Sequence, residues 1–173
     1  MISTVPMLMT LQTTLRPTLR PPASTDATSQ GRRCRPDAYS LTYKAEAAET
    51  GGRLVCVEIS VPPGVGIPPH RHRNEDEAFY VLAGCVIIEG DDCGVGGVSL
   101  EAGGFFYGPR GRVHGFRCGG TDAARLLVLV TPGTGTGAMF AELAELGPRM
   151  GERMDPAQVA AVCGRYGVTF VRP

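Results

Sequence analysis

Hydrophobic residues after position 53 fall into short runs, and glycine, proline and polar pairs separate these runs. The clearest runs are LVCVEISV at 54–61 and EAFYVLAGCVIIE at 77–89, and the turn signal Gly90-Asp91-Asp92 follows the second. Further strands are predicted at 98–100, 105–107, 113–117 and 125–131. Short strands rich in Val, Ile and Phe, with Gly and Pro between them, are typical of an all-β sandwich or barrel.

The pattern changes to a helical period near the C-terminus. Two apolar faces at helical spacing are formed by Met139, Phe140, Leu143 and Leu146, and by Val159, Val162 and Tyr166. Asp155 and Pro156 predict an N-cap and a first helical residue, and Gly167 suits a left-handed C-terminal cap. We expect these helices to cover a barrel surface or to form a dimer contact, and a closing strand at 168–171.

Residues 1–36 differ from the rest of the chain. They are rich in Thr, Pro, Arg and Ser and carry one acidic residue, Asp26, so we predict a disordered tail. Its five arginines suit either a solvated tail or a weak anionic contact. The other residues, 37–173, are expected to form one domain with a C-terminal helical extension, because 173 residues suit a single domain.

Composition excludes several classes of function. The formal net charge is zero, which argues against a nucleic-acid partner. No run approaches the ~20 apolar residues of a membrane span, and the N-terminus lacks the apolar core of a signal peptide, so a cytoplasmic protein is expected. None of the six cysteines forms a C-x-x-C pair, which favours reduced, buried thiols.

The candidate chemistry lies in the three histidines of the chain. In an extended strand His70 and His72 point to the same face, as two neighbouring metal ligands require. Glu77 follows a short polar bend and opens the next apolar run, from which its carboxylate can reach the same ion. His114 follows a Pro- and Gly-containing turn that leads into another predicted strand.

Two spaced sets of residues enclose these side chains. The first, Gly64, His70, His72, Glu77 and Gly84, matches G-x5-H-x-H-x4-E-x6-G, and the second, Gly103, Pro109, Gly111 and His114, matches G-x5-P-x-G-x2-H. These sets resemble the two motifs of the cupins, although Cys118 stands where the second motif ends in Asn. Stretches such as EDEAFYVLAG and PRGRVHGF resemble small bacterial cupins of the quercetin-dioxygenase-like type.

The resemblance implies a double-stranded β-helix, or jelly-roll barrel, with C-terminal helices. It implies His70, His72, Glu77 and His114 as ligands of one divalent transition metal ion, and Fe, Mn, Ni, Cu and Zn all suit three imidazoles and a carboxylate. It also implies a catalytic role for Glu77 as acceptor of a substrate proton. Cys118 is expected to fill space or to lie just behind the ligands.

Strand alternation predicts the walls of a substrate pocket. Phe79 and Val81 share the face of Glu77, and Arg112 and Phe116 share that of His114. We expect a small-molecule substrate, enolic or phenolic as in flavonols and polyketides, and O2 as a second reactant in a dioxygenase-type oxidation. A non-redox cyclase or isomerase and a non-enzymatic ligand-binding cupin are the alternatives, because fold does not fix function. A homodimer is expected because small barrels with exposed edges often pair.

Overall fold

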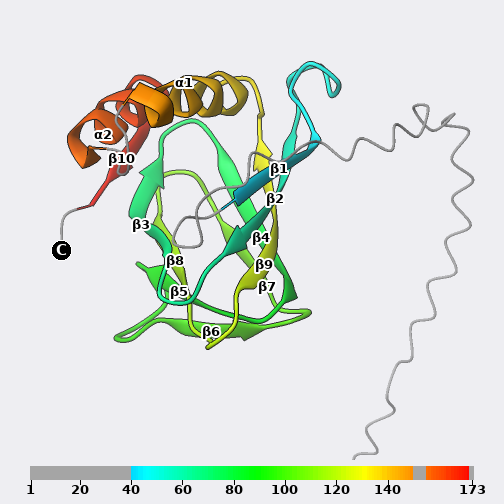
Figure 1. Cartoon of the computed structure of the whole chain (residues 1–173), viewed down its shortest axis with the longest axis vertical. Coiled ribbons are helices and arrows are strands. Elements are labelled where there is room, and N and C mark those ends of the chain that lie inside the picture. The colour runs from blue at the N-terminus through cyan, green and yellow to red at the C-terminus, as the bar shows by residue number, and fades with distance from the viewer. Residues whose placement is uncertain (1–39, 150–154, 172–173) are drawn as a thin grey trace, which may run out of the picture.

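A computed structural model describes residues 40–149 and 155–171, which form a β-barrel with helices at one end (Figure 1). The strands are β1 (Ser40–Ala45), β2 (Val55–Val61), β3 (Gly66–His72), β4 (Asp76–Ala83), β5 (Cys85–Gly90), β6 (Val98–Glu101), β7 (Phe105–Gly108), β8 (Val113–Cys118), β9 (Ala124–Thr131) and β10 (Val168–Phe170). The helices are α1 (Thr136–Arg149) and α2 (Pro156–Arg165). The predicted disordered tail, residues 1–36, lies outside the described residues.

The strands form two five-stranded antiparallel sheets, in the orders β1-β2-β9-β4-β7 and β10-β3-β8-β5-β6. Buried side chains alternate with more exposed ones along β2 and β9, as expected where one face of a sheet meets the core. The inner faces of both sheets supply the main core, including Val57, Phe79, Ile88 and Leu126. The predicted all-β jelly-roll barrel with C-terminal helices is confirmed.

The apolar run at 77–89 forms two strands in different sheets. Gly84 separates β4 from β5 and has φ of 75°, in the left-handed region that favours glycine. A Cβ at this position would also lie 2.9 Å from the Cα of Ala124. The chain therefore turns from one sheet into the other at Gly84, although the hydrophobic pattern continues across it.

Strand β3 carries two of the histidines and contains Pro68 and Pro69. Its pairing with β8 shifts register between Ile67 and His70, which accommodates residues that lack an N–H donor. Its other neighbour is β10, in the register Val168↔His72 and Phe170↔His70. Strand β3 is therefore held on both sides, once by the last strand of the described chain.

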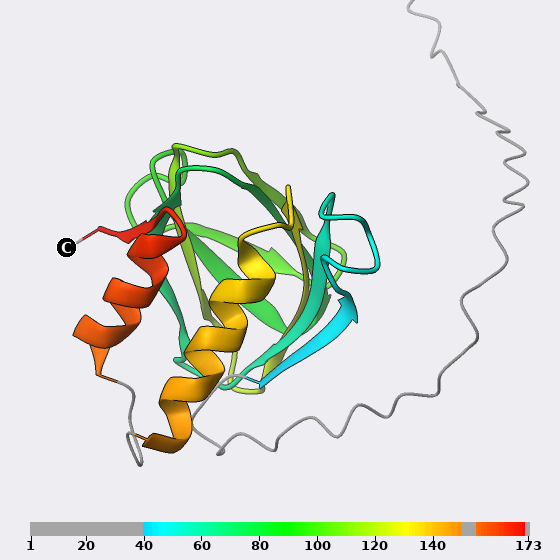
Figure 2. The same cartoon turned by 90° about the horizontal axis from the view of Figure 1, so that it is seen from above.

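Both helices lie at the end of the barrel that is uppermost in Figure 1, and Figure 2 looks onto this end. Met139 of α1 packs with Val162 and Cys163 of α2 and Val168 of β10 in a second, smaller core. Asp155 caps α2 as predicted, because its Oδ1 accepts a hydrogen bond from Ala157 N at 2.9 Å. Neither described helix is long and apolar enough to cross a membrane.

Candidate metal centre

Four side chains from three strands meet inside the barrel at the end from which α1 departs. His70 and His72 come from β3, His114 from β8 and Glu77 from β4. His70 and His114 are paired across β3 and β8, while Asp76 at the start of β4 pairs with Thr131 at the end of β9. His70 and His72 are each 4% exposed, His114 is 1% exposed, and the Glu77 side chain is 12% exposed. The structure thus brings together the four residues expected to be metal ligands.

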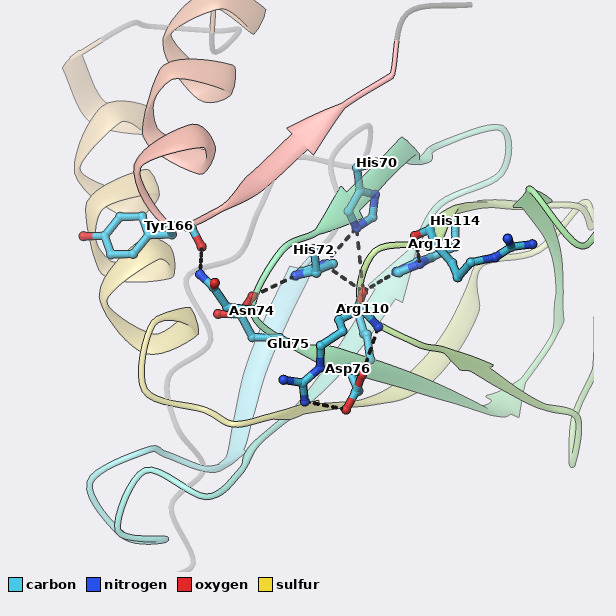
Figure 3. A network of polar contacts seen from close by, with 10 residues as sticks. His70, His72, Asn74, Glu75, Asp76, Arg110, Arg112, His114 and Tyr166 are labelled. Atoms are coloured by element: carbon cyan, nitrogen blue, oxygen red, sulfur yellow. Dashed lines mark hydrogen bonds and ion pairs between the residues drawn. The ribbon is translucent and has the colours of Figure 1, made fainter.

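The four ligand atoms converge on one point. Glu77 Oε2 lies 3.0 Å from His114 Nε2, 3.2 Å from His72 Nε2 and 3.7 Å from His70 Nε2. His70 Nε2 and His72 Nε2 are 3.1 Å apart. All four potential ligand atoms lie within 4.8 Å of one another, so the cluster could bind one metal ion (Figure 3).

The outer nitrogen of each imidazole faces an oxygen atom. His70 Nδ1 lies 2.9 Å from the carbonyl oxygen of Pro68, and His114 Nδ1 lies 3.3 Å from that of Arg112. Both ring nitrogens of His114 face an acceptor oxygen, because its Nε2 also lies 3.0 Å from Glu77 Oε2, so a neutral ring can donate to only one of them. With a metal ion bound at Nε2, the hydrogen would be on Nδ1 and would be donated to the carbonyl.

Two carboxylates favour a charged His72 at this point. Burial disfavours a charged His72, but Glu75 and Glu77 outweigh burial and raise the pKa of His72 to about 9. Burial alone would raise the pKa of Glu77, but the facing imidazoles of His114, His70 and His72 hold it well below 4.5. The metal-free cluster therefore holds a proton where a metal ion would bind, and metal binding would release that proton.

Close packing fixes the ring of His114. A Cβ at residue 108 would lie 2.8 Å from His114 Nδ1, so only glycine leaves room for the imidazole. The rings of Phe79 and Phe106 lie 5.9 Å and 6.1 Å from the His114 ring, centroid to centroid. His72 and His114 stack at 5.6 Å with an interplanar angle of 6°. The site is thus backed by apolar rings and by one close backbone contact.

Of the residues predicted to line a substrate pocket, three are buried in the core and one is exposed. Phe79, Val81 and Phe116 are 0%, 0% and 3% exposed within the main core, and Phe79 contacts the His114 ring. The structure does not bring the guanidinium of Arg112 to the cluster. Its side chain is 49% exposed, pairs with Asp92 and Asp91, and points away from the histidines in Figure 3. Arg112 precedes β8, so strand alternation from His114 does not apply to it.

Cys118 lies in the main core rather than at the ligands. It is 2% exposed and pairs with Val86 across β5 and β8. Its thiol donates to the carbonyl of Asp122 at 3.2 Å. The five described cysteines are all free thiols.

Sequence reasoning missed Glu75, which was assigned to a polar bend. Its side chain is 5% exposed, and its Oε2 lies 3.5 Å from His72 Nδ1. Both of these atoms are buried without a hydrogen bond of normal length. The polar sequence around Glu75 gave no sign of burial, because helix α1, which begins beside it, is distant in sequence.

Two five-stranded antiparallel sheets around a buried three-histidine, one-glutamate cluster define a cupin fold. Residues 57–130 match the family model described as Cupin domain. No curated protein matches the chain.

Solved structures agree with this fold. A conserved protein with a double-stranded β-helix domain from Klebsiella pneumoniae has 22% identity and a TM-score of 0.51, over 61% of this chain and 86% of its own. TT1209 from Thermus thermophilus has 23% identity and a TM-score of 0.51, over 60% of this chain and 92% of its own. A predicted oxalate decarboxylase from Thermotoga maritima has 18% identity and a TM-score of 0.50, over 54% of this chain and 79% of its own. At these identities the similarity supports the fold alone.

Proposed function

We propose that this protein is a metal-dependent, dioxygenase-type enzyme that acts on an enolic or phenolic small molecule. The observation that carries the proposal is the convergence of three Nε2 atoms and Glu77 Oε2 within 4.8 Å of one another. When each imidazole is neutral and carries its hydrogen on Nδ1, these four atoms are all acceptors. A single proton serves only one pair of them, whereas one cation can bind all four.

The residues fit a divalent transition metal. Three imidazoles and one carboxylate suit Fe, Mn, Ni, Cu or Zn, while soft thiolate ligands and all-oxygen cages are absent from the described cluster. Such an ion would supply Lewis-acid stabilisation of an enolate or phenolate and, if it is Fe, Mn, Ni or Cu, redox chemistry with O2.

The protein's own residues would handle the substrate proton. The low pKa keeps Glu77 ionised at neutral pH, so its carboxylate is available as a ligand. It would accept a proton only from a substrate hydroxyl that metal binding has made acidic, because a carboxylate of low pKa is a weak base. Its position at the centre of the cluster places this acceptor within 3.7 Å of each imidazole Nε2. Glu77 is therefore our candidate catalytic residue as well as a candidate ligand.

Apolar rings lie behind the cluster. Phe79 and Phe106 stack at 5.9 Å with an interplanar angle of 18°, and both contact the His114 ring. These buried rings exclude water from behind His114 and strengthen electrostatic interactions at the cluster. A flavonol- or polyketide-like substrate is proposed from the sequence resemblance to quercetin-dioxygenase-like cupins.

Metal content is the first test. The protein is purified without added metal or a metal-binding tag and analysed for Fe, Mn, Ni, Cu and Zn beside His72→Ala. The matched control is Glu142→Gln, which alters a carboxylate on α1 that pairs with Arg165 of α2 and is 37% exposed. We expect about one equivalent of a redox-active metal in the protein and the control, and loss in His72→Ala.

Oxygen uptake with flavonol and catechol probes is then measured with the metal-loaded protein. Uptake that requires both the metal and a probe would support the dioxygenase proposal. Conversion of a polyketide-like probe without oxygen uptake, or one equivalent of zinc, would replace it with a non-redox cyclase or isomerase. No metal after reconstitution would overturn the proposed function.

A further inference from the structure

The three histidines of the cluster differ in what holds their outer nitrogens. The partners of His70 and His114 are backbone carbonyls, those of Pro68 and Arg112. The partner of His72 is a side chain, the carboxylate of Glu75, with Oε2 at 3.5 Å from Nδ1. Figure 3 shows Glu75 on the side of His72 that faces away from the other two histidines.

This carboxylate is buried without a Lys or Arg of the described residues in contact. Glu75 is 4% exposed, and among the described residues no Lys or Arg nitrogen lies within 4.0 Å of it. Its Oε2 has no hydrogen-bond partner of normal length, and neither has His72 Nδ1. A buried carboxylate without a Lys or Arg in contact is costly, so its position requires an explanation from its surroundings.

Two features make a negative charge favourable there. A Cβ at Gly135 would lie 3.2 Å from Glu75 Oε1, which places the carboxylate beside the amino end of α1. The helix dipole favours anions at that end, and the first turn of α1 contains no acidic residue of its own. The second feature is the cluster itself, because the charges of Glu75 and Glu77 together balance those of one divalent ion.

We infer that Glu75 is a positioning residue that holds His72 with Nδ1 protonated and Nε2 directed at the metal. A carboxylate on the outer nitrogen fixes the tautomer and the orientation of the ring and makes the imidazole a stronger ligand. The other two histidines obtain this orientation from the backbone, so Glu75 is the one such partner in the described site that a substitution can remove. This inference rests on the metal site of the proposed function.

Zinc binding and histidine NMR test the inference together. The affinity of the apoprotein for Zn²⁺ is measured by competition with a chromogenic chelator, for wild type, Glu75→Ala, Glu75→Gln and the control Glu142→Gln. We expect Glu75→Ala to weaken Zn²⁺ binding about 10–100-fold. Glu75→Gln should fall between Glu75→Ala and wild type, because an amide oxygen still accepts from Nδ1 but the charge is lost. The control should bind as wild type.

The NMR readout separates positioning from a general loss of stability. The chain has three histidines, and all three lie in the cluster. ¹⁵N-histidine spectra of the zinc-loaded protein without a tag therefore contain signals from the cluster alone. We expect three Nδ1-protonated rings in wild type and a shifted or rapidly exchanging Nδ1 resonance for one ring in Glu75→Ala. Thermal melts of the apoproteins show whether each variant is folded.

The outcomes distinguish the two proposals. Unchanged zinc affinity and an unchanged His72 Nδ1 resonance in folded Glu75→Ala would overturn the role of Glu75 and leave the metal site standing. A lowered melting temperature with unchanged affinity would do the same, because it would make Glu75 purely structural. A wild-type protein that binds no zinc would overturn the metal site and this inference with it.

Discussion

Asp76, the first residue of β4, pairs with Arg110 in the turn before β8. Asp76 Oδ1 accepts hydrogen bonds from Arg110 N at 2.9 Å and Nε at 3.1 Å, and Oδ2 accepts one from Nη2 at 2.7 Å (Figure 3). These bonds with Arg110 lower the pKa of Asp76 to about 2. Asp76 directly precedes Glu77, while Arg110 lies in the turn before His114, so the pair fixes one motif relative to the other.

We predict that Asp76→Asn loosens this connection. The variant loses the charge-assisted bonds, so the melting temperature should fall by about 2–4 °C, and metal affinity should decrease modestly. Calorimetry and chelator competition measure the two effects. Asp92→Asn is the matched control, because it removes the nearby pair with Arg112 at a side chain that is 65% exposed. Equal behaviour of the two variants would contradict a special role for the Asp76–Arg110 pair.

Gly108→Ala should disturb the metal centre with little other change. The added methyl group would lie 2.8 Å from Nδ1 and 2.9 Å from Cε1 of His114, so the ring must move off its present position. We expect metal affinity to fall about 10-fold or more, measured by chelator competition. Gly164→Ala in α2 meets nothing within 4 Å and should bind metal as wild type does.

The loss of folding stability at acid pH should depend on Glu58. Its carboxylate pairs with Lys44 of β1 at 2.9 Å and with Arg125 of β9 at 2.8 Å, and these partners, Lys44 first, lower its pKa below 4.5. A lowered folded-state pKa stabilises the protein above the unfolded-state value, and this stabilisation is lost as the pH falls below about 4.5. Urea unfolding from pH 7 to pH 3 should therefore show a shallower decline in Glu58→Gln than in wild type. Parallel declines would refute this assignment.

Phe79→Ala should be among the most destabilising substitutions in the barrel. Phe79 is 0% exposed and contacts the rings of Phe106, Phe116 and His114. Truncation leaves a cavity in the core, so the free energy of unfolding should fall by about 3–5 kcal/mol in urea titrations. Val95→Ala, at a side chain that is fully exposed, should change it by less than about 0.5 kcal/mol. A small loss for Phe79→Ala would mean that the core collapses around the missing ring.

The homodimer remains a prediction, and the structure offers a surface on which to test it. Four large apolar side chains are exposed on β4 and the edge strand β7: Tyr80 (41%), Leu82 (37%), Phe105 (60%) and Tyr107 (53%). We expect light scattering to give twice the chain mass of 18.3 kDa, and Phe105→Lys to shift the protein toward the monomer. A wild-type monomer at high concentration would contradict the prediction.

The sequence predicted the features that depend on local spacing. Alternation placed most strands, the Asp155-Pro156 pair marked the start of α2, and the spacing of His70, His72, Glu77 and His114 selected the residues that cluster in the barrel. The strands and the cap depend on neighbours within a few positions, which a single sequence displays, whereas the joining of His114 to the other ligands came from the resemblance to the two cupin motifs.

The features that sequence reasoning missed depend on contacts between distant segments. The run at 77–89 continues across Gly84, so its hydrophobic pattern could not reveal a change of sheet. Glu75 is buried because α1 begins beside it, and Arg112 is exposed because it lies in a turn where two aspartates attract its side chain. The short β1 was also not predicted, since its register with β2 is what defines it as a strand.

The pairing of β10 with β3 has a consequence for biosynthesis. β10 follows every other described strand, so one edge of the histidine-bearing strand stays open until residues 168–170 have left the ribosome. Phe170 then covers His70, with ring centroids 5.9 Å apart. A nascent chain stalled before this point would present His70 and His72 on a strand edge without its β10 partner. Premature metal binding and the addition of a strand from another molecule would then compete with the pairing of β10.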